Sequence, residues 1–333
     1  MITGELNYFS MVDDKSKITT ATLKWSNELE ITVPLENIGV ECMYQGSIPG
    51  DNSSIILVTG CKNEVQDIQI QSSKYGDTLG TVLNGKVELL YSSGSDVGSD
   101  VVTNNSTNYN LDDDDLKMVD DVQYLAAWPE GYHFDIYLYL SKSWQESFGT
   151  NAERKAKFIT IQAKNMLQHP TLSVKILMKP RYKKTDDDFM PIDGEDLDKL
   201  TKIIPGQLQK PGIAHVVLTR NGSKLINGIA KRASVCEKDK TAVAIVRWNE
   251  DLLSTAQTLA HEIGHLFGMV HDEETHRGRE YTCEEDDIYM MGEGTSLKKR
   301  VSKWSDCSNK DFRLYWLNYF RQYYEELCLS GEL

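Results

Sequence analysis

The stretch that decides the fold is residues 261–271, which read His261-Glu262-Ile263-Gly264-His265-Leu266-Phe267-Gly268-Met269-Val270-His271. It ends an apolar-periodic segment, residues 251–267, that predicts a helix. His261 and His265 are four residues apart, so both imidazoles leave the same face of this helix, one turn apart. Gly268 allows the helix to stop and the chain to turn sharply, because glycine adopts positive φ without penalty. The turn brings His271 back towards the other two histidines.

This pattern predicts a catalytic zinc site. Imidazoles at this spacing can bind one Zn²⁺ ion, and three protein ligands (His261, His265 and His271) leave an open position for water. Glu262 neighbours the first ligand without joining the set, so it can hold that water and accept its proton as general base. The other histidines have no ligand spacing among themselves, and we interpret them as ordinary surface or core residues: His133, His169, His215 and His276.

The eleven-residue motif resembles that of the metzincin metallopeptidases. The next residue, Asp272, resembles the reprolysin branch, which comprises adamalysin, the ADAM and ADAMTS proteins and venom metalloproteinases. The Met-turn of that family is similar to Tyr289-Met290-Met291-Gly292, where Met291 aligns best and Met290 is a near rival. The resemblance implies that Met291 packs beneath the zinc ligands as an apolar floor and does not bind metal.

The resemblance extends along most of the chain. Asn227-Gly228-Ile229-Ala230 before Cys236, Trp304-Ser305-Asp306-Cys307-Ser308, and Cys328 are similar to reprolysin segments around the active site. Cys42 and Cys61 resemble the hairpin of reprolysin prodomains. The resemblance implies three disulfides: Cys42 with Cys61, Cys236 with Cys328, and Cys283 with Cys307.

Some features depart from the family pattern. No unpaired cysteine stands between Cys61 and the catalytic part, so a cysteine that caps the zinc is not expected. No dibasic processing site occurs in the linker. Some family members bind a structural Ca²⁺ through an Asp before a Leu-Thr strand end, and Ile213 stands near that position, so the Ca²⁺ site is doubtful.

The chain divides into two units of different charge. All of the net charge of −14 lies in residues 1–130, whereas residues 131–333 are neutral overall. Alternating apolar residues over 17–91 predict β structure. Residues 92–125 are acidic and rich in Ser, Asn and Asp, which predicts an exposed linker. We therefore expect a β-rich, prodomain-like unit over residues 1–125 and a catalytic domain over 131–333.

The catalytic domain is predicted to be α/β (α+β), with a mixed, mostly parallel sheet, an active-site helix and a Met-turn. The expected strands are residues 133–140, 172–178, 213–219 and 242–247. The expected helices are residues 151–168, 193–203, 251–267 and 311–327. We interpret Ala242–Arg247 either as an edge strand that pairs with an extended substrate or as a plain edge of the sheet.

Composition excludes several function classes. The hydrophobic fraction of 40% and the charged fraction of 26% are ordinary for a soluble globular protein. No stretch approaches the roughly 18 apolar residues of a membrane span. The acidic balance argues against nucleic-acid binding. The start of the sequence has no signal-peptide pattern, and we expect that a signal was trimmed from it, because the cysteines and the sequons at Asn52, Asn104, Asn105 and Asn221 fit a secreted glycoprotein.

The sequence therefore predicts a secreted zinc metalloendopeptidase that acts on protein or peptide substrates. Its prodomain-like segment is expected to pack on its own catalytic domain and to cover the cleft. The aspartates Asp112–Asp115 and Asp120-Asp121 either form a solvated linker or supply a carboxylate to the open zinc position. Two alternatives remain. One is a proteolytically silent binding protein of the same fold, against which intact Glu262 and three intact histidines weigh. The other is a cytosolic zinc protein without disulfides.

Overall fold

The structure is a computed structural model. It describes residues 6–13, 19–25, 29–37, 42–51, 54–59, 66–71, 78–83, 85–89, 101–103, 131–173, 175–192, 194–222, 226–248, 252–272, 289–292, 303–322 and 330–332. The chain forms two compact units, Met1–Ser95 and Asp96–Leu333, so the boundary falls at the start of the predicted linker.

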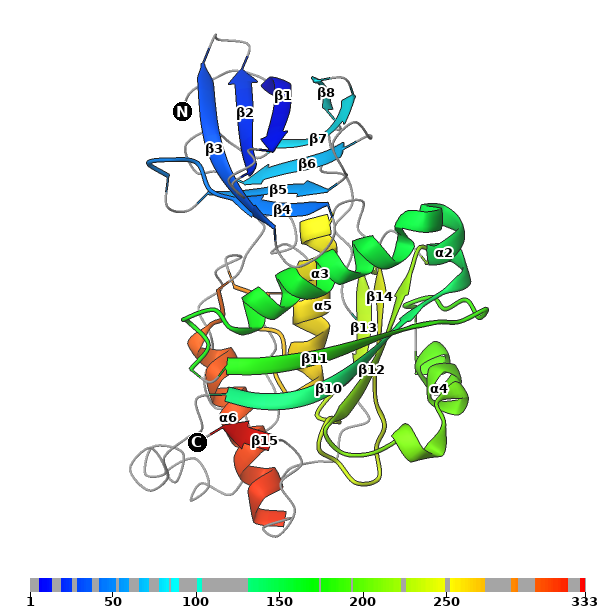
Figure 1. The fold of residues 1–333 in the computed structure, drawn as a ribbon. Coiled ribbons are helices and arrows are strands. Elements are labelled where there is room, and N and C mark those ends of the chain that lie inside the picture. The colour runs from blue at the N-terminus through cyan, green and yellow to red at the C-terminus, as the bar shows by residue number, and fades with distance from the viewer. Residues whose placement is uncertain are drawn as a thin grey trace. The chain divides into compact units, whose positions relative to one another are not determined.

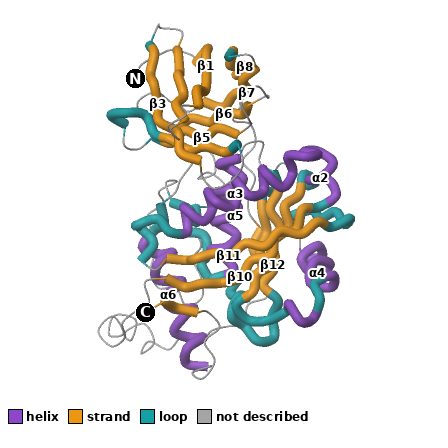
Figure 2. Tube along the Cα trace, in the orientation of Figure 1, coloured by secondary structure: helices purple, strands orange, loops and turns teal. Residues whose placement is uncertain are grey.

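The first unit is a closed antiparallel β-barrel of eight strands (Figures 1 and 2). The strands are β1 (Leu6–Asp13), β2 (Thr19–Trp25), β3 (Glu30–Asn37), β4 (Met43–Gly46), β5 (Ile55–Thr59), β6 (Gln66–Gln71), β7 (Thr78–Leu83) and β8 (Lys86–Leu89). Each pairs with the next, and Tyr8 opposite Lys86 closes the ring between β1 and β8. Alternate apolar side chains such as Leu23, Val33 and Ile70 fill the interior, as the period-two pattern requires.

The second unit is built on a mixed sheet with the order β11-β10-β12-β14-β13-β9 (Figure 1). Its strands are β9 (Val101–Thr103), β10 (Gly131–Leu140), β11 (Lys175–Lys184), β12 (Ile213–Thr219), β13 (Gly228–Lys231) and β14 (Ala242–Arg247), with β15 (Ser330–Glu332) antiparallel to the start of β10. β10, β11, β12 and β14 run parallel. β13 is antiparallel to β14, and β9 is parallel to β13.

Helices cover both faces of this sheet (Figure 2). They are α2 (Lys142–Phe148), α3 (Ala152–Leu167), α4 (Gly194–Ile203), α5 (Leu252–Leu266) and α6 (Asp306–Gln322), with short 3₁₀ turns η1 (Gly149–Asn151) and η2 (Gly206–Leu208). On one face, α5 packs against α3, β13 and β14. On the other, Leu197 and Leu200 of α4 pack on Val217, Val243 and Ile245. Because side chains alternate along a strand, these two faces bury every residue of β14 and all of β12 except the partly buried Ile213.

The predicted α/β class is confirmed, and most elements of the catalytic unit fall close to the expected ranges. The expectation for Ala242–Arg247 is wrong, because β14 pairs with β12 on one side and with β13 on the other. β13 therefore lies between β14 and the end of the sheet. Residues 101–103 of the predicted linker form β9, which pairs with the outer side of β13.

β11 lies at the opposite end of the sheet order from β9. It holds five basic residues, Lys175, Lys179, Arg181, Lys183 and Lys184, and it contains Pro180. A proline fits a strand that has a neighbour on one side only, because it cannot donate a hydrogen bond to a second one. Among the helices that the structure describes, none is both long and apolar enough to cross a membrane.

Candidate metal centre

The site is built at the C-terminal end of α5, a helix whose every residue is buried. Gly268 has φ +87° and ends the helix. Its N–H donates to the carbonyl of His265 over 2.9 Å, and the N–H of Met269 donates to the carbonyl of Gly264 over 3.1 Å. These two bonds are the Schellman arrangement, which needs a left-handed residue at the turn. The chain therefore reverses at once and returns over the end of the helix.

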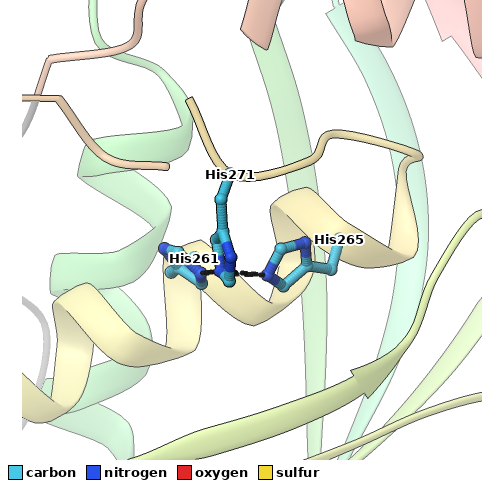
Figure 3. Close-up of side chains that lie close together, drawn as sticks. All are labelled: His261, His265 and His271. Atoms are coloured by element: carbon cyan, nitrogen blue, oxygen red, sulfur yellow. Dashed lines mark hydrogen bonds between the residues drawn. The ribbon is translucent and has the colours of Figure 1, made fainter. Parts of the chain in front are cut away.

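The reversal brings three imidazoles together (Figure 3). The Nε2 atom of His261 lies 3.0 Å from Nε2 of His265 and 3.1 Å from Nε2 of His271. The last two are 3.2 Å apart. All three side chains are buried, and their rings point toward one another (Figure 3). Among the residues that the structure describes, this is the one group of His, Cys, Asp and Glu arranged to hold a metal ion.

Backbone carbonyls fix which nitrogen of the first two histidines carries the proton. Nδ1 of His261 lies 2.6 Å from the carbonyl oxygen of Met290, and Nδ1 of His265 lies 2.8 Å from that of Met269. A carbonyl can only accept, so each Nδ1 donates, and in the neutral ring each Nε2 presents a lone pair to the centre. Burial, together with His261 and His271, holds the pKa of His265 well below its usual value. The imidazole therefore stays neutral, as a metal ligand must.

The residues present fit a zinc ion. Nitrogens about 2.0–2.1 Å from a tetrahedral zinc stand about 3.3 Å from each other, close to the observed 3.0–3.2 Å. Lone pairs crowded this closely repel one another unless a cation lies between them. Three imidazoles with backbone acceptors behind them are also a donor set that zinc prefers.

Glu262 lies beside this centre, on the helix between the two ligand positions. Its side chain is fully buried. The Glu262 side chain packs against the backbone of Gly228, the first residue of β13. The structure thus brings the expected base and the three expected ligands into one region, from two neighbouring elements.

The segment Tyr289–Gly292 contacts His261 and Asp272 through its backbone. The carbonyl of Met291 accepts a hydrogen bond from Asp272 N–H over 2.9 Å, while that of Met290 accepts from His261. Met291 also lies so close to α5 that a Cβ on Gly264 would be 2.8 Å from its sulfur. Both methionines are fully buried. Met291 therefore packs against α5 at Gly264, its role as the floor beneath the ligands stays a prediction, and Met290 contributes through its backbone.

Asp272 and residues at the start of α6 hold the segment after α5 that carries His271. Ser305 donates its hydroxyl proton to Oδ1 of Asp272 over 2.6 Å. The N–H of Val270 donates to Oδ2 of Asp311 over 3.2 Å. Two residues that flank His271 are thus anchored to side chains near the start of α6, which restricts where the third imidazole can move.

The remaining candidate residues are only partly described. Cys42, Cys236 and Cys307 are disulfide-bonded, while Cys61, Cys283 and Cys328 lie outside the described residues, so the pairing stays a prediction. His276 also lies outside them. His215 is a core residue, stacked on Tyr137 with ring centroids 5.4 Å apart. His169 bonds to Thr171. Neither belongs to the metal centre.

Sequence reasoning missed two kinds of contribution. The carbonyls of Met269 and Met290 orient the ligands, but backbone groups leave no trace in a sequence pattern. Gly228 was noticed only for its resemblance to family members, although a glycine within a strand can mark a close approach of another group. Its contact with Glu262 is such an approach.

One family model matches part of the chain. Residues 197–330 match the model of the reprolysin (M12B) family zinc metalloproteases. A human relative, "A disintegrin and metalloproteinase with thrombospondin motifs 10", is 36% identical over 85 residues, which are 24% of this chain and 7% of that protein. The mouse protein with the same name but number 16 is 31% identical over 106 residues, 32% of this chain and 8% of its own length. The matched segments thus span less than a tenth of these relatives.

A solved structure shares the fold over both units. It is metalloproteinase-II from Bacteroides fragilis, with a TM-score of 0.50 and 13% sequence identity, over 92% of this chain and 90% of that one. At this identity the likeness concerns the fold alone. It agrees with the α/β class of the second unit.

Proposed function

We propose that this chain is a zinc-dependent endopeptidase acting on proteins or peptides, because its residues 197–330 match the model of the reprolysin (M12B) family zinc metalloproteases. The observation that carries the proposal is the convergence of three buried Nε2 atoms within 3.0–3.2 Å of one another. Glu262 beside them supplies the group that the reaction needs.

In this mechanism His261, His265 and His271 hold the metal. Zinc bound by these residues would supply a Lewis acid that polarises the scissile carbonyl and lowers the pKa of water to about 7. Glu262 accepts the proton of the attacking water on its carboxylate and then delivers it to the leaving amine. Met290 and Met269 keep the ligands oriented through their carbonyls. The buried surroundings of Glu262 strengthen these electrostatic interactions by excluding bulk water.

The outer side of β13 is the proposed place for the substrate backbone. β13 lies next to Glu262 through Gly228, and an extended peptide can add to such a strand by main-chain hydrogen bonds. β9 pairs with Ile229, Ala230 and Lys231 on this side. The proposal therefore includes latency: while β9 is paired, a substrate strand competes with it for the same donors and acceptors.

The setting proposed for this activity is extracellular. Disulfide-bonded Cys42, Cys236 and Cys307 suit an oxidising compartment. A silent binding protein of the same fold is the alternative, and it differs in one measurable respect, because it binds partners without cutting them.

The test is direct. The purified protein is assayed for zinc content and incubated with a peptide library, with and without a chelator, and the cuts are mapped. We expect one zinc per chain, cleavage, loss of cleavage with chelator, and recovery on adding zinc. Zinc binding without any cleavage, even after removal of residues 1–125, would support the binding protein instead.

A further inference from the structure

Gly228 has no conformational reason to be glycine. It is not among the glycines with positive φ, and it occupies an ordinary strand position opposite Val246. The reason lies in the space around it. A Cβ at this position would stand 2.7 Å from Cδ and 2.8 Å from Cγ of Glu262, and closer still to Oε1. Cβ atoms essentially never come within 3.0 Å of another group.

Hydrogen bonds and packing hold both backbones in place. Gly228 is held by β14, and the two residues before it are bound by Arg247. The guanidinium of Arg247 donates to the carbonyl of Ile226 over 3.1 Å and to the side-chain oxygen of Asn227 over 2.8 Å. The backbone N–H of Arg247 donates to the carbonyl of Asn227 over 2.8 Å. Glu262 sits on the fully buried α5. The Glu262 side chain is the part that must shift, because its atoms are the nearest ones that a Cβ would meet.

We propose that Gly228 is a positioning residue, whose missing side chain sets where the Glu262 carboxylate lies beside the three histidines. The inference deepens the proposed function and rests on it for its effect on the rate. Any side chain at position 228 pushes the carboxylate out of that place. A displacement of about 1 Å in a reacting group can cost on the order of 10²-fold in rate.

The first experiment compares two glycine substitutions in the full chain. Gly228→Ala is expected to lower kcat by about 10- to 100-fold, with KM within about twofold and zinc content unchanged. Gly206→Ala is the matched control, because a Cβ there meets nothing within 4 Å. We expect it to behave as the wild type. A wild-type kcat for Gly228→Ala would overturn the proposal, and so would a change confined to KM.

The second experiment needs no activity. Thermal unfolding is measured for wild type, Gly228→Ala, Glu262→Ala and the double variant. If the clash is with the Glu262 side chain, Gly228→Ala lowers Tm in the wild-type background but has little effect once Glu262 is truncated. An equal loss of Tm in both backgrounds would mean that the strand itself rejects alanine, and would overturn the proposal. If the coupling is found and the protein cleaves no peptide, the proposed function alone fails.

Discussion

Glu262 and His261 are neighbours in the chain but have different tasks. His261 turns its Nε2 to the centre because Met290 holds its Nδ1. Glu262 stands beside the ligand set, so its removal should leave the metal in place. This separation of roles makes the assignment testable one residue at a time.

Glu262→Ala is expected to abolish peptide cleavage while one zinc stays bound. Loss of a general base should lower the rate by on the order of 10²–10⁴-fold. Zinc content and cleavage are measured on the same preparation, with His265→Ala as the comparison that loses both. Cleavage near the wild-type rate by Glu262→Ala would remove this residue from the mechanism.

Because His215 is buried, we expect the free energy of unfolding to fall in mild acid. Its Nε2–H bonds to the carbonyl of Leu208 over 3.0 Å. Burial raises the pKa of Tyr139 to about 12, so that hydroxyl stays protonated and donates to Nδ1 of His215 over 3.2 Å. Burial also lowers the pKa of His215 from 6.5 to about 4. Between pH 6.5 and about pH 4, His215 binds a proton in the unfolded chain but not in the folded one. The free energy of unfolding therefore falls as the pH drops through this window.

The size of the effect follows from the same two values. The difference corresponds to about 3 kcal/mol in the free energy of unfolding, lost between about pH 6.5 and pH 4. Unfolding of the wild type and of His215→Gln is measured across this range. The difference between the two curves should slope only inside the window. A flat difference would show that His215 does not titrate as its burial requires.

At the scale of elements, the turn after α5 decides where the third ligand lies. Gly268→Ala places a Cβ in a left-handed conformation, which costs about 1–2 kcal/mol, and 2.8 Å from Cβ of Tyr315. We expect a lower Tm and weaker zinc binding, because His271 follows directly from this turn. Zinc affinity is measured by competition with a chelator. Unchanged affinity would mean that the turn does not set the position of His271.

β9 is the element proposed to compete with substrate. Val102→Pro removes one N–H and disfavours the strand pairing with β13. We expect the full chain to hydrolyse peptides several-fold faster with this change. Asn108→Pro, outside β9, serves as the control. Equal rates in wild type and Val102→Pro would remove the inhibitory role of β9.

The elements also show how far sequence patterns reach. β12 was expected at residues 213–219 and has those bounds, because an apolar run buried on both faces is visible in the sequence. β13 was missed, since Gly228-Ile229-Ala230-Lys231 is short and lacks alternation. Its pairing with β14 and β9 depends on residues far away in the chain. The metal centre was readable because its three histidines come from one short segment.

For the molecule as a whole, the predicted disulfides are the main covalent constraint. We expect Cys42 paired with Cys61, Cys236 with Cys328, and Cys283 with Cys307. Each bridge should contribute roughly 2–4 kcal/mol by restricting the unfolded chain. Peptide mapping without reductant identifies the pairs. A different pairing would leave the fold intact but refute the assignment, and six free thiols in the native protein would also refute the extracellular setting.

The two ends of the sheet in the second unit, β11 and β9, imply that the solubility of the protein changes if β9 is removed. β11 carries five basic residues and Pro180, features that discourage a strand from joining another molecule. At the other end of the sheet, β9 covers the outer side of β13 by pairing with Ile229, Ala230 and Lys231. Cutting the chain after Thr103 and losing β9 would uncover this strand. The processed form should therefore self-associate at concentrations where the intact chain stays monomeric, and a peptide bound along β13 should keep it dispersed.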